Sequence, residues 1–181
     1  YHNLDEKLIF SDSKVKKGDY SSKKLPYSLA DGDISSYEKL IGTLYSPTEK
    51  QKLEWAVGAV LAGDSKYIQK FIVIYGSPGS GKSTFLNIVE EIFSGYCTSF
   101  EANKLSGSNN SFSLEPFANN PLVGIQQDGD LSKIKDNTVL NSIVGHDRMN
   151  VNEKFKSIYS MRFLAFLFMG TNKPVQITDA K

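Results

Sequence analysis

Residues 76–83 read GSPGSGKS and satisfy the phosphate-binding pattern G-x-x-x-x-G-K-[ST] at every fixed position. Glycines let the backbone N–H groups of such a loop curl around phosphate oxygens. The lysine of the pattern reaches the β- and γ-phosphates, and the final hydroxyl binds Mg²⁺. This glycine-rich loop therefore predicts a site for ATP and Mg²⁺ made by Gly76, Ser77, Pro78, Gly79, Ser80, Gly81, Lys82, Ser83 and the adjacent Thr84.

The sequence on either side of the loop fits this prediction. Residues 71–75 form a short apolar, β-branched run, as expected for a buried parallel strand. Residues 85–93 carry apolar side chains at helical spacing, and Gly95 is suited to end that helix. A phosphate in the loop would thus meet the positive end of a helix dipole.

Two further strand ends carry polar residues. An apolar run at 122–125 leads to Asp128 and Asp130, and the apolar run 163–169 leads to Asn172. In open parallel sheets the ligand binds at the carboxyl ends of the strands, so we expect these residues to meet the loop. Asp128 would hold Mg²⁺, and Asn172 would orient the attacking water. Ordinary turns remain the alternative at both positions, and the choice between Asp128 and Asp130 as the catalytic carboxylate stays open.

Composition excludes several other classes of protein. The chain has 181 residues, 40% of them hydrophobic, and a net charge of +1, so any DNA contact must come from a local basic feature. One cysteine and two histidines provide neither a disulfide framework nor a zinc cluster. No apolar run is long enough for a membrane span, and no signal peptide pattern is present, which predicts a cytoplasmic protein.

The chain divides near residue 45. Residues 1–44 mix lysine clusters with acidic residues and show no sustained period, which predicts a linker or accessory arm. Ser46 and Glu49 then form a capping box, and Pro47 suits the first helical position, so a helix should start here and end near Gly63. Residues 45–181 are expected to form one α/β domain, with a mainly parallel sheet flanked by helices, and another helix is predicted from Asn137 to Gly145.

Several segments together resemble the superfamily 3 helicases, specifically the phage and poxvirus-type primase-helicases. The resemblance covers residues 46–181. Besides the glycine-rich loop and the strand that ends at Asp128, it rests on the helix at 54–63, the segments 140–147 and 151–156, and the strand end GTNKP at 170–174.

The resemblance implies an AAA+-like P-loop ATPase that assembles as a homo-oligomeric, hexameric ring and pulls single-stranded DNA through its channel. Whether a primase region is attached stays open. Lys154 and Lys156 lie where the family has a basic hairpin. They alternate about Phe155, so an extended segment would place both ammonium groups on one side, and DNA contact is expected. A solvated surface strand is the alternative, and Arg148 and Arg162 are weaker candidates.

This chain departs from the family at two places. Gln126 and Gln127 stand before Asp128, where family members have adjacent acidic residues, which leaves the catalytic base uncertain. The family's arginine finger lies beyond the Asn172 motif and is not found before Lys181. We therefore expect an incomplete motor that binds ATP but hydrolyses it slowly by itself.

Two other functions compete with a helicase of viral or phage DNA replication in the host cytoplasm. An ATP-switched replication initiator or loader would bind DNA without processive unwinding, and the Gln-Gln-Asp sequence favours it. A small-molecule P-loop kinase is disfavoured, because the sequence reveals no lid and no acceptor pocket.

Overall fold

The computed structural model describes residues 23–27, 30–105, 112–130, 132, 134 and 136–174. Its helices are α1 Ser35–Leu44, α2 Pro47–Leu61, α3 Lys82–Ile92 and α4 Thr138–Val144, with short 3₁₀ turns at Ser65–Tyr67, Ala102–Leu105 and Glu115–Phe117. Its strands are β1 Ile72–Tyr75, β2 Cys97–Ser99, β3 Val123–Gln126, β4 Arg148–Val151, β5 Tyr159–Arg162 and β6 Phe166–Thr171.

Four strands form one parallel sheet in the order β1-β6-β3-β2. The central strands β3 and β6 are buried along their whole length, which explains their continuous apolar sequences. Side chains of β6 alternate between the two sides of the sheet: Phe166 and Phe168 join one core cluster, and Leu167 and Met169 join the other.

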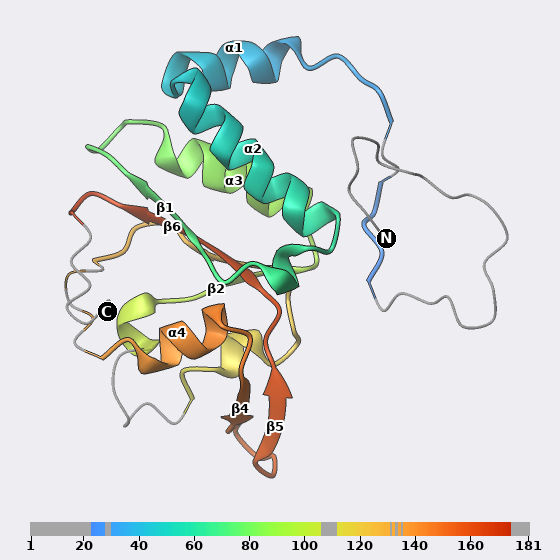
Figure 1. Cartoon of the computed structure of the whole chain (residues 1–181), viewed down its shortest axis with the longest axis vertical. Coiled ribbons are helices and arrows are strands. Elements are labelled where there is room, and N and C mark those ends of the chain that lie inside the picture. Colours follow the sequence, from blue (N-terminus) through green and yellow to red (C-terminus); the bar gives the residue numbers. More distant parts are fainter. Residues whose placement is uncertain are drawn as a thin grey trace, which may run out of the picture.

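Helices cover both faces of this sheet (Figure 1). α1, α2 and α3 lie on one side, and their buried side chains belong to the cluster around Phe85 and Phe168. α4 and the antiparallel hairpin β4–β5 lie on the other side, with the cluster around Phe117 and Phe163. The chain is therefore a mixed α/β protein with a layered core, as the sequence predicts.

Local sequence signals explain where the main helices begin. Ser46 and Glu49 form the predicted capping box of α2: the backbone N–H of Ser46 donates to the Glu49 carboxylate at 2.9 Å, and Pro47 starts the helix. α4 begins after Asn137 and ends at Gly145, as predicted. The side chain of Asn137, however, makes no capping hydrogen bond.

Several expectations differ from the structure. α1 lies within the segment expected to be an arm without regular structure. It begins without a capping side chain, and its Ile41 is fully buried against the core. The last strand begins at Phe166, three residues later than expected. Trp55, on α2, is 53% exposed. Across the described residues, none of the helices has the length and apolar content of a membrane span.

Candidate nucleotide site

The glycine-rich loop joins β1 to α3, as the sequence predicts. Gly79 and Gly81 have φ angles of 79° and 84°, in the left-handed region that glycine enters at little cost. Gly81 is also the residue immediately before the first turn of α3. Two left-handed residues in quick succession turn the chain sharply into the helix, so the first N–H groups of α3 face the space that the loop encloses.

Lys82 points its ammonium group back into the loop. The residue is only 6% exposed, and its Nζ donates to the carbonyl oxygens of Gly76 at 2.9 Å and Ser77 at 2.8 Å. A buried ammonium requires such acceptors. Phosphate oxygens could replace these carbonyls as acceptors without any long movement of the side chain.

Close packing fixes the start of the loop. The N–H of Gly76 donates to the carbonyl of Thr171 at 3.2 Å, which ties the loop to the end of β6. A Cβ atom on Gly76 would lie 2.6 Å from Ser80 Oγ, so a larger residue would require the Ser80 side chain to move. Ser83 and Thr84 follow in the first turn of α3, Ser83 exposed and Thr84 partly buried.

Asp128 and Asn172 meet at the same edge of the sheet. Asn172 Nδ2 lies 3.2 Å from Asp128 Oδ1 and 3.3 Å from Oδ2, and both residues are exposed. Because β6 lies between β1 and β3, their strand ends adjoin the end that carries the loop. The structure thus brings together these two predicted residues, and the amide keeps the carboxylate in place.

Asp130 has a different setting. Its carboxylate accepts from Lys173 Nζ at 2.7 Å and from the backbone N–H of Ser132 at 3.2 Å. Lys173 follows Asn172 directly, so the two carboxylates contact neighbouring residues of the same segment. The charge of the Asp130 carboxylate is therefore already balanced by the ammonium group of Lys173.

The two glutamines before Asp128 have structural partners. Gln126 is buried, and its Oε1 accepts from the backbone N–H of Ala102 at 2.9 Å. Gln127 Nε2 donates to Asn87 Oδ1 at 2.8 Å, which links the end of β3 to α3, while Gln127 Oε1 is buried without a hydrogen-bond partner. Asn87 lies four residues after Ser83, on the same face of α3.

Few carboxylates are available for a metal ion here. Within the part of the chain that the structure describes, no three His, Cys, Asp or Glu side chains gather closely enough to hold one. A Mg²⁺ ion at this edge would depend on Ser83, on Asp128 and on the phosphates of a bound nucleotide. That arrangement is typical of Mg²⁺, which usually binds through one or two carboxylates and substrate phosphates.

Lys154 and Lys156 lie between β4 and β5, in the segment 152–158. Lys154 and Phe155 form a turn, and Phe155 has a φ of 64° and is fully exposed. The expected extended segment with alternating side chains is therefore wrong, because the chain reverses direction here. Both lysines are exposed; Lys154 Nζ lies 5.9 Å from the ring centre of Phe112, and Lys156 Nζ contacts Glu153 at 2.6 Å.

Glu153 organises this turn. Hydrogen bonds from the side chains of Lys156 and Tyr159 hold the pKa of its carboxyl below the usual value. At the base of the hairpin, Arg148 and Arg162 face each other across the strands, and both are exposed. Like charges directly opposite are unfavourable, so an anion near this pair would stabilise it.

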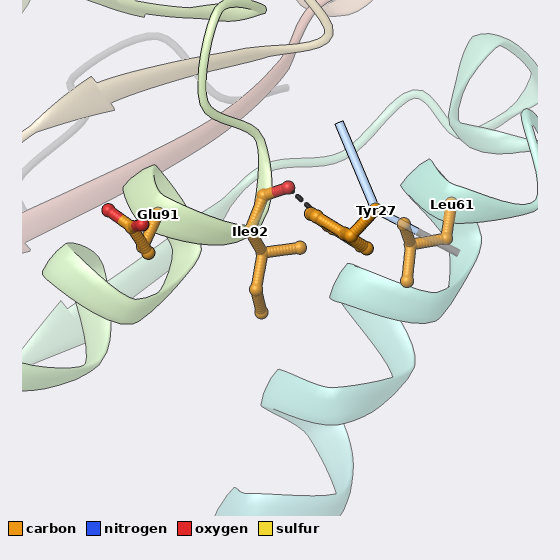
Figure 2. Close-up of a pocket in the computed structure, with 4 residues that line it drawn as sticks. All are labelled: Tyr27, Leu61, Glu91 and Ile92. Carbon is orange, nitrogen blue, oxygen red and sulfur yellow. Dashed lines mark hydrogen bonds between the residues drawn. The ribbon is translucent and has the colours of Figure 1, made fainter. Parts of the chain in front are cut away.

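A cavity of about 370 Å³ lies at the other end of α3, lined by Tyr27, Leu61, Glu91 and Ile92. Figure 2 shows the hydroxyl of Tyr27 donating to the carbonyl of Ile92, the last residue of α3. This contact attaches residues 23–27 to the core. The cavity is separated from Lys82 by the length of the helix, so it is no part of the nucleotide site.

A protein-family model described as a family of unknown function (DUF5906) matches residues 74–181. No curated protein matches the chain. Three similar solved structures are apo forms of the C-terminal region of NrS-1. One has a TM-score of 0.61 and 15% identity over 88% of this chain and 37% of that one.

The other two are A-form apo structures, both with TM-scores of 0.58, at 15% and 14% identity over 80% and 79% of this chain. This chain spans 35% of the length of each of them. At such identities the likeness concerns the fold. The chain belongs to the DUF5906 family, and its fold is similar to that of part of the NrS-1 C-terminal region.

Proposed function

We propose that this chain is the ATP-hydrolysing motor domain of a DNA helicase that acts in viral or phage DNA replication. One observation carries the proposal: the Lys82 ammonium lies inside the glycine-rich loop, beside the sheet edge where Asp128 and Asn172 meet. Phosphate, metal and water each have a group suited to them at one edge of a parallel sheet.

The residues present fit Mg²⁺-bound ATP. Left-handed glycines give the loop its curvature, and Gly76 packs closely against the side chain of Ser80. Lys82 would exchange its carbonyl partners for β- and γ-phosphate oxygens, and the first N–H groups of α3 would bind phosphate. Bound Mg²⁺ would supply charge neutralisation between the phosphates, held by Ser83 and Asp128.

Asn172 is proposed to orient the attacking water. Its Nδ2 already contacts the Asp128 carboxylate, so its amide oxygen is directed away from that contact and would accept a hydrogen bond from water. Asp128 is the nearest carboxylate to this amide and is the proposed metal ligand. Asp130, paired with Lys173, is the weaker candidate for that role.

The DNA part of the proposal rests on the hairpin. Its turn exposes Lys154, Phe155 and Lys156, which combines two cations with an aromatic ring, as expected for contact with single-stranded DNA. The resemblance to superfamily 3 helicases supports the same conclusion. A ring of identical subunits would bring several such hairpins to one channel.

One observation favours the second candidate, an ATP-switched initiator or loader. Neither glutamine before Asp128 is a carboxylate, and both are engaged in hydrogen bonds that fix the fold. Such a site would bind ATP and hydrolyse it slowly, so that occupancy by ATP would control assembly.

ATP turnover by the oligomeric protein separates the two candidates. We expect single-stranded DNA to stimulate steady-state hydrolysis by at least about tenfold, a difference of roughly 1.4 kcal/mol in the barrier. Tight ATP binding with no DNA-stimulated turnover in the same oligomer would refute the motor and favour the switch.

A further inference from the structure

The corner between α1 and α2, formed by Leu44 and Tyr45, contacts the glycine-rich loop at Gly81. Leu44 ends α1, and both of its terminal methyl carbons lie 2.7 Å from the place where a Cβ atom on Gly81 would be. The side chain of Leu44 therefore covers the backbone of Gly81. No sequence signal predicts this contact.

Tyr45 adds a hydrogen bond to the same residue. Its hydroxyl donates to the carbonyl oxygen of Gly81 at 3.0 Å, and its ring packs edge-on against Phe85, with ring centres 6.1 Å apart. The N–H of Phe85 donates to that oxygen as well, at 3.2 Å. The Gly81 carbonyl thus accepts two hydrogen bonds, one from the Phe85 N–H in the first turn of α3 and one from the Tyr45 hydroxyl at the α1–α2 corner.

Holding this carbonyl also fixes the next N–H group. The peptide bond between Gly81 and Lys82 is trans and planar, so the Gly81 C=O and the Lys82 N–H point in opposite directions. The Lys82 N–H has no acceptor within the helix, because it belongs to the first turn of α3. Such N–H groups are the ones that bind phosphate at helix N-termini.

We propose that Tyr45 is a positioning residue for nucleotide binding: by holding the Gly81 carbonyl, it aims the Lys82 N–H at a phosphate of the bound nucleotide. This inference rests on the proposed function, since it needs a phosphate in the loop. Burial and the nearby Glu49 raise the pKa of the Tyr45 hydroxyl, so it remains protonated and able to donate at neutral pH.

The hydrogen bond from Tyr45 to Gly81 also couples the α1–α2 corner to nucleotide binding. If Tyr45 favours phosphate binding, then bound phosphate must favour the ordered α1–α2 corner by an equal free energy. Segments attached before α1 would thereby sense whether the loop holds a nucleotide. Hydrogen exchange of the Tyr45 amide, which donates to Ile41 in the corner, should slow when nucleotide binds.

Tyr45→Phe tests the inference, because it removes the hydroxyl and keeps the ring on Phe85. We expect affinity for Mg²⁺-bound ATP, and for inorganic pyrophosphate, to fall about three- to tenfold in calorimetry, the range for one lost hydrogen bond. Tyr37→Phe is the matched control. It removes a hydroxyl bonded to Glu54 in the same pair of helices, away from the loop, and should leave both affinities unchanged.

A spectroscopic readout separates positioning from general stability. Pyrophosphate should shift the NMR signal of the Lys82 amide strongly in wild type and in Tyr37→Phe, and more weakly in Tyr45→Phe at saturation. If wild type binds neither ATP nor pyrophosphate, the proposed function fails. If wild type binds both, and Tyr45→Phe equals Tyr37→Phe in affinity and in this shift, the positioning role of Tyr45 is overturned.

Discussion

The glycine-rich loop and the hairpin turn are both short connections rich in polar residues, yet the fold treats them differently. In the loop, Lys82 is buried and makes two hydrogen bonds to backbone carbonyls. In the turn, Lys154 and Lys156 are exposed, and their contacts are with a ring and a carboxylate at the surface.

This difference in burial indicates how strongly the loop supports nucleotide binding and how strongly the turn supports DNA binding. A buried lysine needs acceptors around its ammonium group; two carbonyls supply them in this loop, and phosphate oxygens are acceptors of the same kind. Exposed lysines in a turn cost little and are common on ordinary surfaces. The loop argues for nucleotide binding by its geometry, whereas the DNA contact of the turn depends more on resemblance. Four variants sharpen or break this contrast.

The largest effect is expected at the loop. Lys82→Ala removes the charge that faces the phosphates, so affinity for Mg²⁺-bound ATP should fall by more than about a hundredfold, as expected for a buried charged partner worth about 3 kcal/mol. Calorimetry measures this directly. Lys70→Ala, which changes an exposed lysine before β1, is the control and should bind ATP as wild type does. Equal ATP affinity in wild type and Lys82→Ala would remove the loop from the site.

Asp128, the proposed Mg²⁺ ligand at the sheet edge, should give the next largest effect. Asp128→Asn keeps the shape of the side chain but loses its charge, so the gain in ATP affinity on adding Mg²⁺ should shrink by about tenfold. Asp130→Asn is the matched variant, since its carboxylate is already paired with Lys173. If the Mg²⁺ effect survives Asp128→Asn and is lost in Asp130→Asn, the assignment of the two carboxylates is reversed.

The turn should give a smaller effect that depends on salt. Replacing both Lys154 and Lys156 by Ala should weaken single-stranded DNA binding and reduce the slope of log K against log salt by about 1.4, from two lost phosphate contacts. The control replaces the exposed Lys66 and Lys70 by Ala and makes the same change in net charge. An unchanged slope in the first variant would mean that the turn is a solvated surface.

The smallest effect concerns the shape of the turn. The pKa of Glu153 is lowered in the folded protein. Its contacts therefore stabilise the turn fully at pH values above the ordinary carboxyl pKa of about 4.5, and this stabilisation is lost as the pH falls through the lowered pKa. Hydrogen exchange of the Lys156 amide, which donates to the Glu153 carbonyl, should therefore be faster in Glu153→Gln than in wild type at pH 7. The difference should disappear as pH falls below the lowered pKa of Glu153. Equal exchange at pH 7 would show that the carboxylate does not order the turn.

Local patterns made part of this structure predictable. The strand, loop and helix around residues 71–93 and the capping box at Ser46 follow from short-range rules of spacing and hydrogen bonding, and the structure agrees with them. The strand ends that carry Asp128 and Asn172 followed from the general geometry of parallel sheets, and the two side chains are indeed in contact.

Long-range contacts explain what the sequence did not reveal. α1 begins without a capping side chain and is held by the burial of Ile41 in the core. Tyr45 lies 36 residues from Gly81, and no local rule pairs a helix corner with a distant loop. The turn at Phe155 needs a positive φ from a bulky residue, which propensity argues against, so the sequence favoured an extended segment.

The most direct test of the central claim is a crystal structure of the protein with Mg²⁺ and a non-hydrolysable ATP analogue. The account predicts that the phosphates lie within the loop of residues 76–83 and that Lys82 Nζ leaves the carbonyls of Gly76 and Ser77 for phosphate oxygens. The metal should lie between Ser83 and Asp128. A nucleotide bound elsewhere, with Lys82 still on those two carbonyls, would contradict it.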